Sequence, residues 1–274
     1  MQKILIFFLV ILFPFVSFSQ YWEVGLFGGT SFYKGDLTPQ IIDFNEIHHA
    51  EGAIVRYNVN QWFTVKGNAY YGEVSGNDAN AKAYDTKVRN LSFKSTLLDI
   101  GVQSEINIRG FQAGHPRYNN TPYLFFGLSI FRFNPKSEYN GTWYELQPMG
   151  TEGQGTTKYN DREKYALTQV SIPMGFGWKY ALNRYWNVGM EFGTRATFTD
   201  YLDDVSKTYV EDDVLRSNHG EIAVLLANRS GEYLDEYESF TSEDNRGNPT
   251  KLDWYYFAGI TISYNILPNA CYRF

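Results

Sequence analysis

The sequence predicts an all-β protein: an eight-stranded antiparallel transmembrane β-barrel with long extracellular loops. The stretch 165–199 carries the main pattern, because apolar and polar residues alternate along two arms separated by residues 181–184. A period of two indicates strands, and the short break indicates a hairpin. One face is apolar and ends in aromatic residues beside the turn, while the other mixes glycine with isolated charges, as in membrane barrels. A half-exposed soluble sheet is the alternative that this hairpin leaves open.

The composition and the N-terminal residues narrow the class of protein further. Aromatic residues make up 18% of the 274 residues, charged residues only 20%, and the formal net charge is −6. An acidic chain of this kind is a poor binder of nucleic acid. The apolar run 4–18 is too short for a spanning helix and predicts a signal peptide at 1–19. The barrel is then expected at 20–267, followed by a periplasmic C-terminal tail at 268–274.

The first four strands are predicted from the same alternation. They are expected at 21–33, 51–59, 62–74 and 91–108. A loop at 34–47, a tight turn at Asn60-Gln61 and a polar loop at 76–90 connect them. In the fourth strand, for example, Leu98, Ile100 and Val102 alternate with Asp99 and Gly101. Such a strand has one apolar face for lipid and one polar face for the interior.

The remaining four strands are expected at 122–133, 168–180, 186–198 and 254–266, and the first of them is apolar on both faces. A long glycine-rich loop at 134–164 and an acidic loop at 200–253 separate them, the latter with a candidate helix at 221–228. Long and short connections therefore alternate. In membrane barrels the short turns face the periplasm and the long loops face outside, which predicts both termini in the periplasm of an outer-membrane protein.

Two groups of aromatic residues are expected to mark the membrane boundaries. Trp178, Tyr180 and Trp186 flank the short turn of the hairpin and are predicted at the periplasmic interface. Trp254 and Tyr256 begin the last strand and are predicted at the outer interface. Aromatic rings of this kind favour the headgroup level on both sides of a bilayer.

Eight ionisable residues fall on the predicted inner face of the strands: Glu23, Arg56, Lys66, Asp99, Glu105, Lys179, Glu191 and Arg195. Half of them are acidic and half are basic. An eight-stranded barrel is only wide enough for side chains to fill its interior. Charges buried there must be paired, since an unpaired charge costs several kcal/mol. The balance predicts a lumen charge network that plugs the barrel, and an ion or proton path is the alternative.

Three sequence features are candidates for chemical sites. The segment 150–155 resembles a phosphate loop but lacks the Lys-Ser/Thr ending, which predicts a flexible loop. His48 and His49 fall at the outer rim, where no carboxylate partner can be placed from the sequence. Carboxylates crowd the longest loop, at Asp200, Asp203, Asp204, Glu211, Asp212 and Asp213. A solvated acidic loop is expected there, with calcium as the alternative. No catalytic residue, metal or cofactor is expected.

The C-terminal tail is a candidate surface for a protein partner. Cys271 is the only cysteine, so it cannot form a disulfide within this chain and is either idle or bridged to another molecule. Tyr272 and Phe274 stand beside it, and aromatic side chains are common anchors of interfaces. These three residues are the predicted partner-binding site.

Several short stretches, taken in order, resemble one known family. They are GGTSFYKGDL at 28–37, FNPK at 133–136, YNGTW at 139–143, ELQP at 145–148 with the residues through 155, SIPMG at 171–175 and TDYLDDV at 199–205. Together they are similar to the PorG-like outer-membrane barrels of the type IX secretion system, over nearly the whole mature chain. The resemblance implies an eight-stranded barrel that anchors or organises the secretion machinery. Its implied partner is a periplasmic ring built from a lipoprotein and a second subunit.

Three functions are therefore consistent with the sequence. The expected one is a non-enzymatic outer-membrane anchor whose partners are membrane lipid and the periplasmic ring subunits. The alternatives are a barrel that binds or passes small hydrophobic ligands, and a barrel enzyme that modifies lipid or peptide. An open lumen would favour the barrel that binds or passes ligands. A rim cluster of serine or aspartate with histidine would favour the barrel enzyme.

Overall fold

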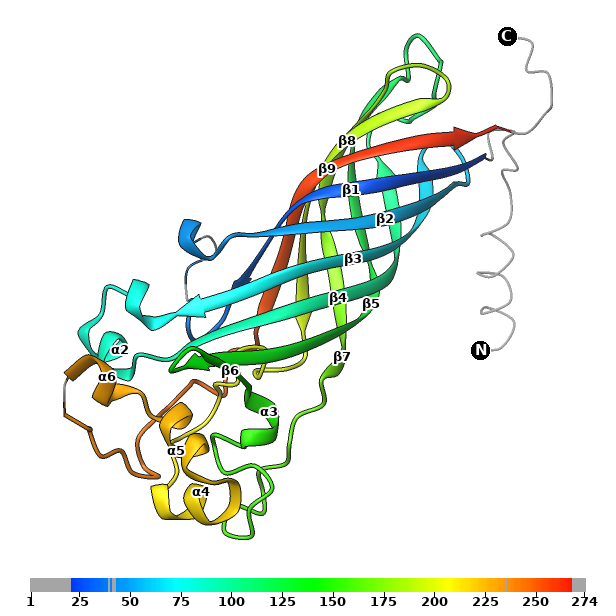
Figure 1. Ribbon diagram of the computed structural model, residues 1–274. Helices are drawn as coiled ribbons and strands as arrows, with labels where there is room; N and C mark the ends of the chain where they lie inside the picture. Colours follow the sequence, from blue (N-terminus) through cyan, green and yellow to red (C-terminus); the bar gives the residue numbers. More distant parts are fainter. Residues whose placement is uncertain (1–20, 39, 41–42, 235, 268–274) are drawn as a thin grey trace, which may run out of the picture.

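The computed structural model describes residues 21–38, 40, 43–234 and 236–267, and Figure 1 shows how they are arranged. The predicted signal peptide at 1–19 and tail at 268–274 lie outside the described residues. Within the described part, the strands are β1 (Tyr21–Lys34), β2 (His48–Asn58), β3 (Phe63–Asn77), β4 (Ser92–Asn107), β5 (Asn120–Tyr139), β6 (Thr142–Glu145), β7 (Thr168–Ala181), β8 (Trp186–Thr197) and β9 (Trp254–Ile266).

The strands form a closed antiparallel barrel. Each long strand pairs with the next along the chain, and β1 pairs with β9 to complete the ring. The short strand β6 pairs only with the end of β5, so eight of the nine strands in the described residues make the barrel wall. The predicted fold class is thereby confirmed. The last strand has the bounds that its alternation predicted, Trp254–Ile266.

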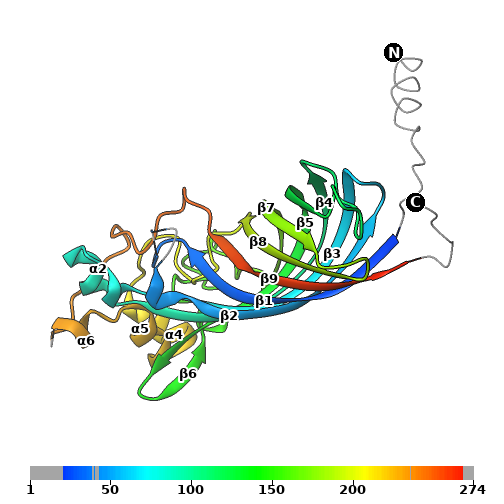
Figure 2. The same cartoon turned by 90° about the horizontal axis from the view of Figure 1, so that it is seen from above.

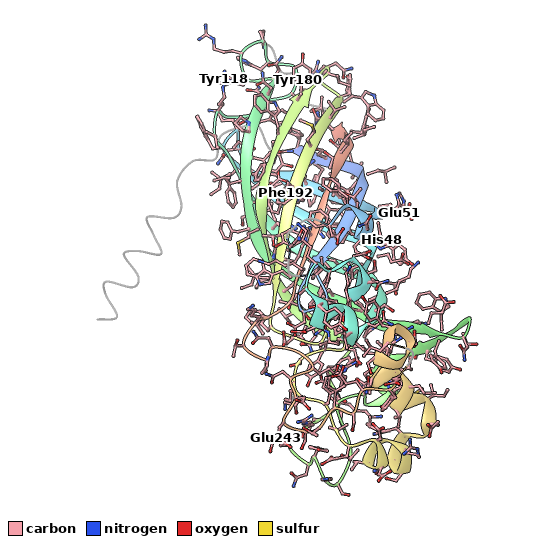
Figure 3. The ribbon with its side chains drawn as sticks, turned by 90° about the vertical axis from the view of Figure 1, so that its left-hand side faces the viewer. His48, Glu51, Tyr118, Tyr180, Phe192 and Glu243 are labelled. Carbon is pink, nitrogen blue, oxygen red and sulfur yellow. The ribbon has the colours of Figure 1, made fainter. Side chains whose placement is uncertain are left out.

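The two ends of the barrel differ in how the strands are joined. At one end, which we call the short-turn end, β1 begins and β9 finishes side by side, with Trp22 opposite Ile266. Tyr118 and Tyr180 lie at this end and Glu243 at the other in Figure 3. At the other end, the loop end, the long connections gather into a folded mass (Figures 1 and 2), which we call the cap.

The outer surface of the barrel wall is apolar. Large hydrophobic side chains point outward and are exposed on every part of the wall, among them Leu26, Leu98, Val102, Leu128, Phe176, Met190 and Ile262. Near the short turns the exposed side chains include the aromatic residues Trp178, Tyr180 and Trp186. At the loop end Tyr256 differs, because it is nearly buried and stacks on Phe32 with ring centroids 4.9 Å apart. Neighbouring side chains thus cover Tyr256, which the sequence predicted at the outer membrane interface.

The predicted loop at 134–164 is in part wrong. β5 continues through Lys136, which pairs with Lys94 on β4, and then turns back as β6. This extension continues past the apolar part of the wall, where both faces of a strand can carry polar residues. The hydrophobic alternation therefore carries no signal there, although the strand continues.

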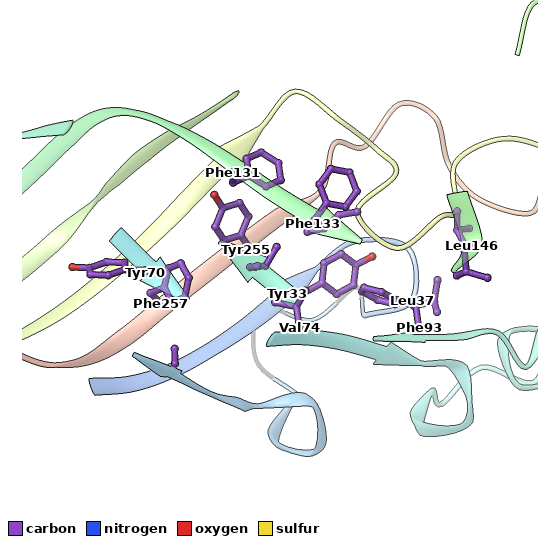
Figure 4. Close-up of a cluster of buried hydrophobic side chains, with 14 of the residues drawn as sticks. Tyr33, Leu37, Tyr70, Val74, Phe93, Phe131, Phe133, Leu146, Tyr255 and Phe257 are labelled. Atoms are coloured by element: carbon purple, nitrogen blue, oxygen red, sulfur yellow. The ribbon is translucent and has the colours of Figure 1, made fainter. Parts of the chain in front are cut away.

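The cap has a core of its own that is continuous with the barrel interior. Figure 4 shows Tyr33, Phe93, Phe133 and Leu146 packed in one buried cluster. The helical elements of the described cap are η1 (Phe44–Glu46), η2 (Asp78–Asn80), α2 (Tyr84–Arg89), α3 (Leu146–Met149), α4 (Asp212–His219), α5 (Glu221–Ala227) and α6 (Ser230–Leu234). The candidate helix at 221–228 is confirmed as α5. Across the described residues, none of these helices has the length and apolar character needed to cross a membrane.

Candidate functional site

The barrel interior holds all eight ionisable residues predicted for it, and each is buried. Six of them form a single cluster, which we call the lumen cluster: Glu23, Arg56, Lys66, Glu105, Lys179 and Glu191. They come from β1, β2, β3, β4, β7 and β8. Their side chains project inward because each occupies the inner position of the two-residue alternation.

Arg56 is at the centre of this cluster. Its Nη1 lies 2.7 Å from Glu23 Oε1, and its Nε lies 2.9 Å from Glu105 Oε1. Lys179 Nζ reaches the other oxygen of Glu105 at 3.1 Å, and Lys66 Nζ lies 2.6 Å from Glu191 Oε2. Three cations thus meet three carboxylates at hydrogen-bonding distance, so the cluster is electrically balanced.

Neutral and aromatic side chains fill the space around the charges. Tyr123 and Tyr70 donate hydrogen bonds to Glu191 at 2.9 Å and 3.2 Å. The ammonium group of Lys66 lies 4.5 Å from the ring centroid of Phe125, and that of Lys179 lies 5.0 Å from Phe111. These hydrogen bonds and cation–π contacts compensate the buried charges. They also occupy the cross-section of the barrel.

Two predicted residues, Asp99 and Arg195, stand apart from the lumen cluster. Asp99 accepts hydrogen bonds from Asn68 at 2.8 Å, Ser129 at 3.0 Å and Tyr255 at 2.7 Å. Arg195 donates to the Gly193 carbonyl and lies over the ring of Phe257 at 4.7 Å. Among the described residues neither forms an ion pair. The expectation of one network of eight charges is therefore wrong for these two, because strand register places them nearer the cap.

The cap contains a second buried polar cluster, which the sequence did not predict. Arg246 Nη1 lies 3.2 Å from Glu152 Oε1 and donates to the Asp204 carbonyl at 2.5 Å. Glu152 in turn accepts hydrogen bonds from the backbone amides of Ser206 and Lys207. The segment 150–155 is thus a buried anchor of the cap. The predicted flexible loop is wrong, since its polar residues Thr151 and Glu152 are buried and bond to the loop at 204–207.

The acidic loop divides into buried and exposed carboxylates. Asp200, Asp203 and Asp204 are buried, whereas Asp213 on α4 is exposed. Burial raises the pKa of Asp200 to about 7 and that of Asp204 to about 6, and it also raises the pKa of Asp203. The described residues hold no group of acidic, histidine or cysteine side chains suited to a metal ion. The expected solvated loop is therefore wrong for its first half.

Comparison with known proteins places the chain in a family. A family model described as "Domain of unknown function (DUF6089)" matches residues 2–222. The chain belongs to this family. No curated protein matches the sequence.

Solved structures similar to this DUF6089 chain include three bacterial barrels. The Ail attachment invasion locus protein of Yersinia pestis, in complex with the heparin analogue sucrose octasulfate, is 8% identical with a TM-score of 0.41, covering 90% of this chain and 99% of that one. Neisserial surface protein A is 9% identical with a TM-score of 0.40, covering 90% and 96%. The outer membrane protein OprG of Pseudomonas aeruginosa is 10% identical with a TM-score of 0.37, covering 91% and 98%.

The predicted partner-binding residues Cys271, Tyr272 and Phe274 lie outside the described residues. The two short turns beside them in the predicted topology are described. Asn119 accepts a backbone hydrogen bond from Ala181 at 2.7 Å, so the turns 109–120 and 181–184 of the DUF6089 chain form one surface. Arg109, Arg117 and Arg184 are exposed on it.

Sequence reasoning missed one group of side chains at the loop end of the wall. His48 contacts Ser75 and Glu73, which lie on the neighbouring strand. A signal was present in the sequence, because Glu73 and Ser75 are two residues apart and must share a face of a strand. The register that brings His48 beside them was not predictable, since β2 begins three residues earlier than expected.

Proposed function

We propose that this protein is an outer-membrane β-barrel whose body serves as a non-enzymatic anchor or organiser of the type IX protein secretion machinery. Its proposed partner is a periplasmic ring made of a lipoprotein and a second subunit. The observation that carries the proposal is the lumen cluster, in which Lys66 on β3 and Glu191 on β8 join opposite sides of a filled interior. A barrel with a filled interior acts through its surfaces and not through a pore.

The apolar wall supports a place in a lipid bilayer. Exposed Leu, Ile, Val, Phe and Met side chains cover the outside of the strands, with tryptophan and tyrosine at the short-turn end. Such a surface is stable in lipid and would aggregate in water. A closed barrel also satisfies every strand edge, as spanning structures must.

Three of the stretches that resemble the PorG-like family meet in the cap. Tyr33 from 28–37 donates a hydrogen bond to Asp203 from 199–205, and Thr151 from 145–155 donates to Asp204 at 2.5 Å. These residues are buried and hold the cap together. Because they are occupied in this way, we place the contact with the ring at the short-turn end. The exposed arginines of the turns 109–120 and 181–184, together with the tail at 267–274, are the proposed surface.

Site-specific photocrosslinking in native outer membranes tests this proposal. A photoreactive amino acid replaces Arg117 at the short-turn end, and the control replaces Thr142, an exposed residue of the β5–β6 hairpin at the loop end. We expect crosslinks to ring subunits from position 117 and none from position 142. Crosslinks from neither position would contradict the anchor, and crosslinks from 142 alone would invert the proposed orientation.

Removal of 268–274 provides an independent test of the tail. We expect the shortened barrel to keep its heat-modifiable gel shift but to recover fewer ring subunits on co-purification. For Cys271, a mixed disulfide on non-reducing gels that disappears in Cys271→Ser would support a covalent bridge.

Planar-bilayer recording is expected to show no steady conductance, and a stable open channel would contradict the sealed lumen.

A further inference from the structure

A serine, a histidine and a glutamate meet on the outside of the barrel at its loop end. Ser75 Oγ lies 2.6 Å from His48 Nε2, and His48 Nδ1 lies 3.2 Å from Glu73 Oε1. The three groups thus stand in the order hydroxyl, imidazole and carboxylate. This order and these distances match a nucleophile, its general base and the acid that orients the base.

Local structure explains why the three groups converge. Glu73 and Ser75 alternate with the inward residue Val74, so both point away from the lumen. Ser31 on β1 holds this part of β3, because its Oγ donates to the Glu73 carbonyl at 2.6 Å and accepts from the Glu73 amide at 3.1 Å. His48 is the first residue of β2, beside Glu51 on the barrel wall in Figure 3. The group therefore rests on strands, which position side chains more rigidly than loops.

A lysine completes the arrangement. Lys94 on β4 is the cross-strand partner of Ser75, and its Nζ lies 2.8 Å from Glu73 Oε1. Directly opposed side chains on one face of a sheet have their Cβ atoms about 5 Å apart. The ammonium group, held by Glu73, thus lies on the same face of the sheet as the serine hydroxyl. A cation on this face stabilises the negative oxygen that develops when a hydroxyl attacks a carbonyl.

The group opens into a hollow that could admit a substrate. The hollow has a volume of about 400 Å³ and is lined by His48, Ser75, Lys94, Phe93, Trp143 and Arg229, among others. Ser75 is 8% exposed, whereas the side chain of His48 is 24% exposed. The reactive hydroxyl is therefore recessed at the wall of a hollow with both aromatic and cationic lining, a combination that suits an amphiphile.

The position along the strand indicates which amphiphile. Tyr71 points outward on β3, is 51% exposed and belongs to the apolar wall. Ser75 is four residues further toward the loops, about 13 Å along the strand. The basic residues Lys94 and Lys136 pair across β4 and β5 at the same level. The hydroxyl thus lies on the loop side of the apolar wall, the side from which the headgroups of the adjacent leaflet would approach it.

We propose that Ser75, His48 and Glu73 form an esterase site for carboxylic esters of membrane amphiphiles in the leaflet at the loop end. The proposal adds a catalytic site at the loop end to a barrel body that itself serves as the anchor, does not depend on the anchor function, and replaces the expectation that the chain has no catalytic residues. Ser75 is the nucleophile, His48 the general base and Glu73 the residue that orients His48. Lys94 stabilises the oxyanion.

The reaction needs only water as a second reactant. Ser75 Oγ attacks the ester carbonyl while its proton passes to His48 Nε2, and the bond to the alcohol breaks as His48 returns that proton to the leaving oxygen. Water then gives a proton to His48 and attacks the acyl-serine ester. The bond to Ser75 breaks, Ser75 regains the proton from His48, and a carboxylic acid leaves.

Glu46 on η1 also contacts the Ser75 hydroxyl and accepts its hydrogen bond in this structure, while its other oxygen accepts from Asn80 at 2.7 Å. A hydroxyl carries one hydrogen, which turns about the Cβ–Oγ bond. The same serine therefore donates either to Glu46 or to His48. Transfer of the hydrogen bond to His48 precedes attack, and Glu46 itself is not needed as the base.

Active-site labelling of the full-length protein in detergent micelles tests the proposal. The probe is a fluorophosphonate, which modifies activated serines, and mass spectrometry of the labelled wild type is expected to place the adduct on Ser75. This measurement requires no variant to fold. Absence of an adduct, or an adduct on another residue, would overturn the site.

Hydrolysis of p-nitrophenyl laurate and butyrate provides the rate, with the laurate expected to be the better substrate. Ser75→Ala and His48→Gln are each expected to lose about 10²- to 10⁴-fold, the range of general-base catalysis. The matched controls are Ser217→Ala, an exposed helical serine, and His49→Gln, a histidine that lies 3.6 Å from exposed Glu51. Both are expected to retain the wild-type rate, and every variant must show the heat-modifiable shift of a folded barrel.

One further variant separates the roles of Glu46 and His48. Glu46→Gln is expected to lose less hydrolysis than His48→Gln, because Glu46 is not the base. Loss of activity in Glu46→Gln with retention in His48→Gln would overturn the assignment of His48. Phosphatidylethanolamine vesicles replace the synthetic ester in a last arm, in which released fatty acid is measured. Hydrolysis of the synthetic esters without release from vesicles would overturn the membrane substrate while leaving the serine assignment intact.

Discussion

The two buried polar clusters of this protein differ in how their charges are compensated. In the lumen cluster every carboxylate faces a cation, as Glu105 faces Arg56 and Lys179. In the cap, Arg246 pairs with Glu152, but Asp203 and Asp253 form no ion pair within the described residues. Backbone amides compensate these carboxylates instead, since Val205 donates to Asp203 and Leu202 donates to Asp253.

This difference follows from the elements that carry the charges. Paired strands hold side chains at fixed separations, so oppositely charged groups can be placed opposite each other across a narrow interior. Loops instead bring their own backbone amides to a carboxylate, which permits several acids to gather. The consequence is a rise in the pKa of Asp203 and Asp253 through burial and repulsion from neighbouring carboxylates. The cap is thus sensitive to pH, and the balanced lumen is not expected to be.

The largest effect is expected from breaking the lumen cluster at Glu105. Glu105→Ala leaves Arg56 and Lys179 without that carboxylate, and removal of one partner of a buried ion pair costs about 3–5 kcal/mol in the free energy of unfolding. Urea unfolding in micelles, followed by tryptophan fluorescence, measures the change. Glu51→Ala is the control, because Glu51 is exposed on the outer face. An unchanged midpoint for Glu105→Ala would contradict a stabilising cluster.

A smaller effect is expected from coupling between Lys66 and Glu191, which lie 2.6 Å apart. Lys66→Met and Glu191→Gln each strand a buried partner, whereas the double variant removes both charges. The double variant should therefore cost less than the sum of the singles, by about 1–3 kcal/mol. The same unfolding measurement completes the double-mutant cycle. Additive costs would show that the two side chains do not interact.

In the cap, Arg246→Ala should loosen loops without unfolding the barrel. Arg246 joins Glu152 to the Asp204 carbonyl and also donates to the Ala227 carbonyl at 3.2 Å. Its loss should lower amide protection across 204–210 by about 1–3 kcal/mol, the cost of unsatisfied buried partners. Hydrogen exchange with mass spectrometry localises the change. Equal loss of protection in the barrel strands would show that cap and wall unfold together.

The smallest effect is expected from pH alone. The pKa of Asp200 is about 7 in the folded cap, above the usual range of an aspartate, so the folded state binds more protons than the unfolded one between about pH 4 and 7. The contribution of Asp200 to stability is present below this window and is lost as pH rises through it. Limited proteolysis at pH 5 and pH 8 should therefore cut the cap faster at pH 8. Asp200→Asn should reduce that difference, and a cap that resists protease better at pH 8 would reverse the expected sign.

The sequence by itself determined the barrel and the residues that face its interior. A strand with lipid on one face must alternate apolar and polar residues with a period of two. This pattern can be recognised in the sequence without knowing which strands pair. It therefore predicted the last strand and the inward direction of Glu105 and Glu191. It also predicted α5, because the apolar residues of 221–228 recur at helical spacing.

Only the tertiary structure decided which of these residues meet. Glu191 and Lys66 are 125 positions apart, and their contact depends on strand register and barrel closure. The same register separates Arg195 and Asp99 from the lumen cluster and brings His48 to Ser75. The contacts within the cap could not be predicted from local sequence patterns either, because buried loops bond to one another through polar groups that do not recur at regular spacing in the sequence. The alternation of apolar and polar residues determines which face of the sheet a side chain occupies. The side chain that it contacts is determined by the closure of the whole sheet.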